Sequence, residues 1–359
     1  MKLSYALIAA IVVVAFLISV PLLNTTKEDF STYNTAWNGA SDAKALASSD
    51  GYTTRSVFAL SEIGSGDGVL FMLNPNSSVS FSASDASTLQ SFVKNGGVLV
   101  LANDFGNGNA ALSGLGVSAA RFNGSLLEDN VSKGVDAAHP LITDVNASGI
   151  TAGVHELYFN YGTALDVSGT NVTVLARSAP TSYLSTSASA NVSATTGAHP
   201  VLATFTYGDG RIVLLSDPSV FINDMLGQAD NQQLLTSMLA NVTGGNTAVP
   251  IMFDESHRAS APVWSLLYDR INADDTVKYT VIVLVSAAFV IGINATALVR
   301  RQRQGQGKDM APAPGDVPTN EAAVIADIVR AHPGWRRARV KGFLKQLQQR
   351  RGIRRDNRK

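Results

Sequence analysis

The sequences GVLFML (Gly68–Leu73), SDASTLQSFVK (Ser84–Lys94) and VLVL (Val98–Leu101) decide the fold. The first and third are continuous apolar runs, which are typical of strands buried on both faces of a sheet. In the second, the apolar residues recur at helical spacing, and Ser84 is the predicted N-cap. Asn95–Gly97 then ends the helix. A strand, a helix and a strand within about 35 residues predict a βαβ unit, and therefore a parallel sheet.

The same alternation continues on both sides of this unit. Tyr207–Gly210, between two of the predicted strands, has the glycines of a hairpin turn. We predict an α/β domain with three layers and a mostly parallel sheet. Its other predicted helices are 41–49 and 231–240, and its other predicted strands are 52–58, 172–176, 201–206, 211–215 and 250–253.

Two long apolar segments predict transmembrane helices on either side of this domain. Tyr5–Leu23 has 19 residues without a charge and Tyr279–Val299 has 21, each about the length that crosses the hydrocarbon core. Tyr5–Leu23 could instead be a cleaved signal peptide. Its apolar run is longer than usual for a signal peptide and no A-x-A site follows, which favours an uncleaved anchor.

Charge is distributed very unequally along the chain. Asn24–Val277 has 10 Lys and Arg against 23 Asp and Glu, whereas Arg300–Lys359 has 16 against 5. The positive-inside rule then predicts a two-pass protein of the cell membrane with both termini in the cytoplasm. The predicted parts are a short cytoplasmic N-terminus (1–4), an extracytoplasmic α/β domain (24–260), a juxtamembrane stalk (261–278), a linker (300–319) and a basic helical hairpin (320–359).

N-x-S/T sequons occur only before the basic tail, which agrees with an extracytoplasmic domain. A surface rich in Ser, Thr and Asn also produces such sequons by chance. The candidate glycosylation sites are Asn24, Asn76, Asn123, Asn130, Asn146, Asn171, Asn191 and Asn241.

Four motifs in this order resemble one family. They are F-S-x-Y-N (Phe30–Asn34), F-V-K-N-G-G-V-L-V-L-A-N-D (Phe92–Asp104), G-D-G-R-I-V-L-L-S-D-P-S (Gly208–Ser219) and F-D-E-S-H-R (Phe253–Arg258). Over residues 27–260 the chain resembles the membrane family called domain of unknown function 4350. The resemblance implies a fold similar to class I glutamine amidotransferases, or flavodoxin-like. It also implies an accessory role in an envelope complex with a MoxR-type ATPase.

The chain has no cysteine, and this excludes the chemistry of that fold's best-known enzymes. An amidotransferase needs a Cys nucleophile on the turn after a central strand. Here Val98–Leu101 leads into Ala102–Gly106, and Ser113 lies too far along to replace the cysteine. Amidotransfer, disulfides and thiolate metal sites are therefore excluded.

The candidate site lies where predicted strands end, which is where open α/β sheets bind ligands. Ligand or partner binding without catalysis is the favoured function, and no cofactor or metal is predicted. For the candidate residues themselves a structural role is favoured: Asp217 caps the segment that begins at Pro218, and Asp254, Glu255 and Arg258 form a local ion pair that holds the domain to the membrane stalk. The alternative function is a metal-dependent hydrolase that uses Asp104, Asp217, Asp254 and His257, with Glu255 polarising a water. The candidate residues are Asp104, Asp217, Asp254, Glu255, His257 and Arg258, with Asp230 and Asn231 added by the family resemblance.

The basic tail predicts a helical hairpin. Asn320–Ala331 and Trp335–Arg351 have apolar residues at helical spacing, and His332–Gly334 separates them. Besides the lipid bilayer around the predicted spans, three partners remain open for this tail. These are anionic lipid, a membrane or cytoplasmic protein bound through the apolar stripe, and nucleic acid. Nucleic acid is disfavoured because no third helix or wing follows.

Overall fold

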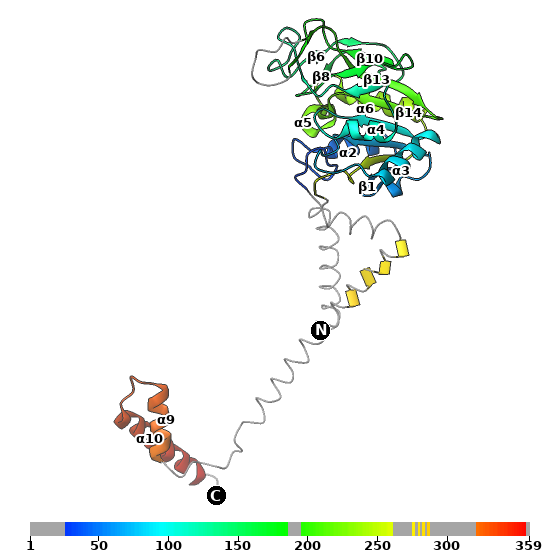
Figure 1. The fold of residues 1–359 in the computed structure, drawn as a ribbon. Coiled ribbons are helices and arrows are strands. Elements are labelled where there is room, and N and C mark those ends of the chain that lie inside the picture. The colour runs from blue at the N-terminus through cyan, green and yellow to red at the C-terminus, as the bar shows by residue number, and fades with distance from the viewer. Residues whose placement is uncertain are drawn as a thin grey trace. The chain divides into compact units, whose positions relative to one another are not determined.

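The computed structural model describes residues 26–185, 195–260 and 321–356, together with four residue pairs between 275 and 287. These residues fall into two units, an α/β domain and a C-terminal tail from residue 287 onward. Figure 1 shows the α/β domain with the labels used below. The two units are described separately.

An eight-stranded sheet forms the centre of the α/β domain. Two neighbouring strands of this sheet are β2 (Val69–Leu73) and β3 (Val98–Ala102). Every residue of both strands is buried, as a central parallel strand requires. Neighbouring strands follow the order β1 (Thr54–Val57), β15 (Ile251–Asp254), β2, β3, β14 (Gly210–Leu215), β13 (Pro200–Tyr207), β10 (Thr173–Arg177) and β7 (Asp144–Val145).

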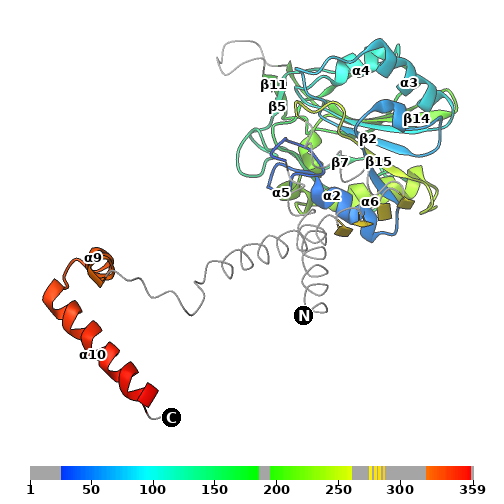
Figure 2. The same ribbon diagram turned by 90° about the horizontal axis from the view of Figure 1, so that it is seen from below.

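Helices cover both faces of this sheet (Figure 2). On one face, α3 (Ala83–Lys94) and α4 (Gly108–Gly114) pack over side chains such as Leu70 and Leu99. On the other face, α2 (Ser41–Ser49) and α6 (Asn231–Val242) pack over the alternate residues of the same strands. The short helix α5 (Asn223–Leu226) lies on the α6 side.

The prediction of a mostly parallel sheet is wrong, because the sheet is mixed. The pairs β1–β15, β15–β2, β2–β3 and β3–β14 are parallel. The pairs β14–β13, β13–β10 and β10–β7 are antiparallel. A two-residue turn at Gly208–Asp209 joins β13 to β14, and so short a connection can only join antiparallel strands. Gly208 has φ +63°, the conformation that such a turn demands.

The predicted flanking transmembrane helices are not supported either. Within the part of the chain that the structure describes, no helix combines the length and the apolar composition needed to cross a bilayer. The longest, α10 (Arg337–Asp356), has 20 residues but a strongly basic sequence. The predicted spans 5–23 and 279–299 lie outside the described residues, apart from isolated positions of the second. The prediction of a two-pass protein of the cell membrane with an extracytoplasmic domain is therefore not supported.

Short strands between β3 and β13 build three small sheets beside the main one. They pair as β12–β11–β5, β4–β9 and β6–β8. Their bounds are β4 (Ala120–Phe122), β5 (Leu126–Glu128), β6 (Leu141–Ile142), β8 (Leu157–Tyr158), β9 (Leu165–Val167), β11 (Tyr183–Ser185) and β12 (Thr195–Thr196). Two 3₁₀ turns, η1 (Leu60–Glu62) and η2 (Pro218–Phe221), complete the domain.

The predicted glycosylation sites differ in their exposure. Asn24 and Asn191 lie outside the described residues. Asn76 and Asn123 are half-buried. The remaining four, Asn130, Asn146, Asn171 and Asn241, are exposed.

The tail forms two helices that pack against each other, α9 (Glu321–Ala331) and α10. They correspond to the two helices that the apolar spacing of the tail predicts. Val340, at the start of α10, is buried in this small unit.

Candidate functional site

A cleft of about 570 Å³ lies at the carboxyl ends of β2 and β3. Two of its walls are the segments that directly follow these parallel strands, which is where α/β sheets form ligand sites. The segment that precedes α2 forms a third wall. The residues lining the cleft are Lys27, Glu28, Asp29, Phe30, Asn74, Pro75, Asn76, Ser77, Asp104, Phe105, Gly106 and Arg258.

A close backbone approach gives the cleft its shape. Asn74 directly follows β2 and has φ +43°, and its Oδ1 atom is buried without a hydrogen-bond partner. Gly106 packs directly on that side chain, since a Cβ atom at Gly106 would come within 2.3 Å of Asn74 Oδ1 and 2.6 Å of the Pro75 carbonyl oxygen. The Asn107 N–H also donates to the Pro75 carbonyl at 2.6 Å. Only glycine fits at position 106.

Asp104 supplies a carboxylate to the cleft wall. It is 9% exposed and accepts a hydrogen bond from the N–H of Phe105. Burial raises the pKa of Asp104, and the N–H groups of Phe105 and Gly106 and the Asn74 side chain offset only part of this effect. Its negative charge is therefore incompletely compensated by the protein.

Asp217 is a second carboxylate at the same edge, after β14. It is fully buried, and it accepts hydrogen bonds from the N–H groups of Asn160 at 2.6 Å and Ser219 at 2.8 Å. The Ser219 bond makes Asp217 the N-cap of η2. Burial and the nearby charge of Asp104 raise the pKa of Asp217 to about 8, although the two N–H groups act in the opposite direction.

A different arrangement surrounds Glu255, just beyond β15. Its carboxylate, on a residue 2% exposed, accepts hydrogen bonds from Ser31 Oγ (2.8 Å), Thr32 N (2.7 Å) and Thr32 Oγ1 (2.8 Å). We call this set of contacts, together with Arg258, the clasp. It ties the segment that precedes α2 to the segment that follows β15, more than 220 residues later.

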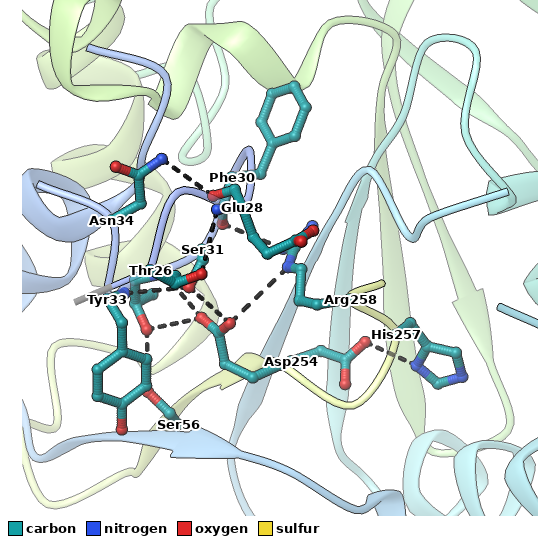
Figure 3. Close-up of polar contacts among 12 residues, drawn as sticks. Thr26, Glu28, Phe30, Ser31, Tyr33, Asn34, Ser56, Asp254, His257 and Arg258 are labelled. Atoms are coloured by element: carbon teal, nitrogen blue, oxygen red, sulfur yellow. Dashed lines mark hydrogen bonds and ion pairs between the residues drawn. The ribbon is translucent and has the colours of Figure 1, made fainter. Parts of the chain in front are cut away.

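Arg258 completes the clasp (Figure 3). It also lines the cleft. Its Nε lies 3.8 Å from Glu255 Oε2, an ion pair beyond hydrogen-bond distance. Its other nitrogens donate to the carbonyl oxygens of Phe30 at 3.0 Å and Asn74 at 3.3 Å. The protein itself thus pairs this cation with Glu255 and holds it with two carbonyl oxygens, while Nε has no hydrogen-bond partner.

His257 belongs to neither arrangement and lines a smaller cavity, together with Asp85 of α3. Figure 3 shows it paired with Asp254. Its Nδ1 lies 2.8 Å from Asp254 Oδ2, and its ring stacks on Phe81 at 4.9 Å. Burial lowers the pKa of His257, but the hydrogen bond and charge of Asp254 and the charge of Asp85, 3.9 Å away, outweigh it and leave the pKa raised.

The structure therefore separates the four residues of the metal-site hypothesis. Asp104 lines the large cleft, Asp217 is buried beside it, and His257, paired with the buried Asp254, lines the other cavity. Within the described ranges, no three His, Cys, Asp or Glu side chains meet at a point that could hold a metal ion. The geometry gives the hydrolase hypothesis no support.

Asp230 and Asn231 have structural partners. Asp230 accepts the N–H groups of His155 at 2.7 Å and Glu156 at 3.1 Å. The buried Asn231 side chain donates to the carbonyl oxygens of Tyr158 and Met225 and accepts the Tyr158 N–H. Both residues fasten the start of α6 to the loop at 155–158 and lie outside the cleft lining.

Comparisons with known proteins identify one family. The family described as "Domain of unknown function (DUF4350)" matches residues 32–239, more than half of the chain. No curated protein matches the chain. Similar solved structures include the mmIFT52 N-terminal domain, at 15% identity and a TM-score of 0.39, covering 48% of this chain and 76% of that one.

Two further structures show similarly low scores. The β-galactosidase from Bacillus circulans sp. alkalophilus has 15% identity and a TM-score of 0.32, with coverage of 51% and 23% of the two chains. Cytoplasmic protein STM1381 from Salmonella typhimurium LT2 has 13% identity and a TM-score of 0.27, with coverage of 57% and 76%. All three TM-scores are below 0.5, so no conclusion rests on these similarities.

Proposed function

The chain belongs to the family described as domain of unknown function (DUF4350), and we propose that its α/β domain binds a partner without catalysis. The carboxyl-edge cleft is the proposed binding site. The observation that carries the proposal is Asp104, a mostly buried carboxylate on the cleft wall whose charge the protein compensates only in part. A bound ligand that supplies the missing compensation would be favoured.

The charge balance of the cleft favours a ligand with a cationic group. Glu28, Asp29 and Asp104 line it, and the only cationic side chains in its lining are Lys27 and Arg258. Arg258 is paired with Glu255, so Lys27 alone offsets three acids. Phe105, 49% exposed beside Asp104, offers an aromatic face that also suits a cation. A lysine- or arginine-containing segment of a protein partner would place its cation against both the acidic side chains and the Phe105 ring.

Two finer points of the proposal rest on the family resemblance. One is a fold similar to class I glutamine amidotransferases, which the strand–helix alternation from β2 to β3 supports. The other is an accessory role beside a MoxR-type ATPase. Thiol chemistry is no part of the proposal, since the chain has no cysteine.

Site-specific photo-crosslinking in the cells that make the protein tests the cleft. A benzophenone amino acid replaces Phe105 in the full chain, and the matched control carries it at Val135, which is 78% exposed and does not line the cleft. The expected result is a discrete adduct from position 105 that is missing from position 135. Adding Asp104→Asn to the position-105 probe should reduce the adduct severalfold. Identical products from both positions would contradict the proposal.

A further inference from the structure

The tail hairpin covers only part of the apolar surface of α10. Helix α9 has 11 residues and α10 has 20, so the shorter helix reaches only part of the longer one. Val340 is 4% exposed and Leu344, one turn later, is half-buried. These two form the inner stripe, which packs in the hairpin.

A second apolar stripe on α10 remains uncovered within the described residues. Phe343 is 60% exposed and Leu347 is 44% exposed, and their spacing of four residues places them side by side on the helix. Trp335, just before α10, is 55% exposed and stacks on His332 with ring centroids 4.8 Å apart. We call Phe343 and Leu347 the outer stripe. Among the described residues of the tail, no third element buries it.

The same unit is strongly cationic. Residues 321–356 contain ten Lys and Arg against three Asp and Glu. Arg336, Arg339, Lys341 and Lys345 are all exposed, and Arg339 lies one turn before Phe343. The uncovered apolar residues are therefore bordered by positive charge.

From this juxtaposition we propose that the outer stripe docks α10 on the surface of a bilayer that contains anionic lipid. Exposed aromatic and leucine side chains next to many Lys and Arg are the features of a helix that lies in the bilayer interface. Anionic headgroups attract the basic residues, while Phe343 and Leu347 enter the boundary of the acyl chains. This peripheral contact needs no spanning helix and is independent of the cleft.

Other occupants of the outer stripe account for only half of these observations. A nucleic acid would satisfy the basic residues through its phosphates, but phosphate contacts leave Phe343 and Leu347 in water. An apolar groove on a protein would cover the outer stripe but would not require the surrounding positive charge. A bilayer with anionic lipid provides both chemistries in one layer.

Trp335 allows a direct test in the full chain. The chain has three tryptophans, so Trp37→Phe and Trp264→Phe leave Trp335 as the single reporter on the tail. The probes are vesicles of phosphatidylcholine with 30% phosphatidylglycerol, and vesicles of phosphatidylcholine alone, each with brominated acyl chains that quench tryptophan. We expect Trp335 emission to fall by about half with phosphatidylglycerol, to change little without it, and to recover at high salt.

Matched variants distinguish binding through the outer stripe from nonspecific adsorption to the vesicles. The double variant Phe343→Ser with Leu347→Ser should need about ten times more lipid for half-maximal quenching. The control Gly342→Ser with Gln346→Ser, also exposed and one turn apart, should need the same amount as the wild type. Equal quenching by both kinds of vesicle would overturn the proposal. The proposal would also be overturned if vesicles with phosphatidylglycerol did not quench Trp335, or if they quenched it equally in the outer-stripe variant. Tighter binding of duplex DNA that is insensitive to the outer-stripe variant would also overturn it.

Discussion

The clasp and the cleft place the same kind of residue at the same edge of the sheet and treat it in opposite ways. Glu255 in the clasp receives three hydrogen bonds from Ser31 and Thr32 and has a cation nearby. Asp104 in the cleft has a raised pKa because burial outweighs its hydrogen bonds, and its charge in turn raises the pKa of the buried Asp217. A fully partnered carboxylate holds the fold together. An undercompensated one is available for a ligand, and this difference distinguishes structure from function along the edge.

Removal of the Glu255 carboxylate is expected to have the largest effect. In Glu255→Ala the Arg258 cation and the Thr32 N–H stay buried without their partner, so the free energy of unfolding should fall by roughly 3–5 kcal/mol. Chemical denaturation followed by circular dichroism measures this change. Asp224→Ala, which removes an exposed acid, should cost less than about 1 kcal/mol. Equal losses in both variants would show that the clasp is not what stabilises this edge.

A substitution at the close backbone approach that shapes the cleft should destabilise the domain almost as much. Gly106→Ala would push a methyl group against Asn74 and Pro75 and should destabilise the domain by roughly 2–3 kcal/mol. Gly227→Ala is the control, because no atom lies within 4 Å of the position of its Cβ. Thermal unfolding of both variants provides the measurement. A Gly106→Ala melting temperature equal to that of the control would mean that the loop relaxes without cost.

Local sequence patterns predicted much of the central sheet but not how it is completed. The helix 41–49 is found at Ser41–Ser49, and the βαβ unit is found as β2, α3 and β3. The helix predicted from Ser84 starts earlier, because Ser82 and Asp85 form a capping box. The parallel share of the sheet was overestimated. The two-residue turn before β14 indicates only that β13 and β14 are antiparallel, and it says nothing about the directions of β10 and β7. The strands that pair beyond β13 are short and carry little periodicity.

The site was predicted in part, for a physical reason. Strand ends give the position of Asp104 and Asp217, since the carboxyl ends of parallel strands share one edge. Sequence could not separate His257 from them, because its direction depends on the turn after β15 and on stacking against Phe81. The partners of Glu255 lie 223 and 224 residues away, so no local spacing reveals them. The one available signal was the F-S-x-Y-N motif, which contains Ser31 and Thr32.

The second carboxylate of the cleft region should make stability depend on pH. The pKa of Asp217 is about 8 in the folded protein and 3.8 ordinarily, so the folded state binds the proton more tightly. The resulting stabilisation is complete below about pH 4 and is lost as the pH rises toward 8. Urea denaturation should therefore show wild-type stability falling by a few kcal/mol between pH 5 and pH 8.

Asp217→Asn removes this titration and tests its origin. Asparagine still accepts the Ser219 N–H but turns an amide toward the Asn160 N–H, so the variant should be the less stable protein at pH 5. The difference between wild type and variant should shrink toward pH 8. Asp224→Asn, at an exposed position, should keep the wild-type pH profile. Parallel pH profiles for wild type and Asp217→Asn would assign the pH dependence to another group.

Phe105→Ala should have the smallest effect on stability and the most specific effect on the cleft. Its side chain is 49% exposed, so truncation should change the free energy of unfolding by no more than about 0.5 kcal/mol. A partner that places a cation and apolar surface against Phe105 would lose roughly 1–2 kcal/mol of binding free energy, a five- to thirtyfold weaker complex. Affinity for the captured partner, measured beside the denaturation curve, separates the two effects. If Phe105→Ala binds as wild type while Glu255→Ala does not, the contact surface belongs to the clasp, and the contrast between clasp and cleft is reversed.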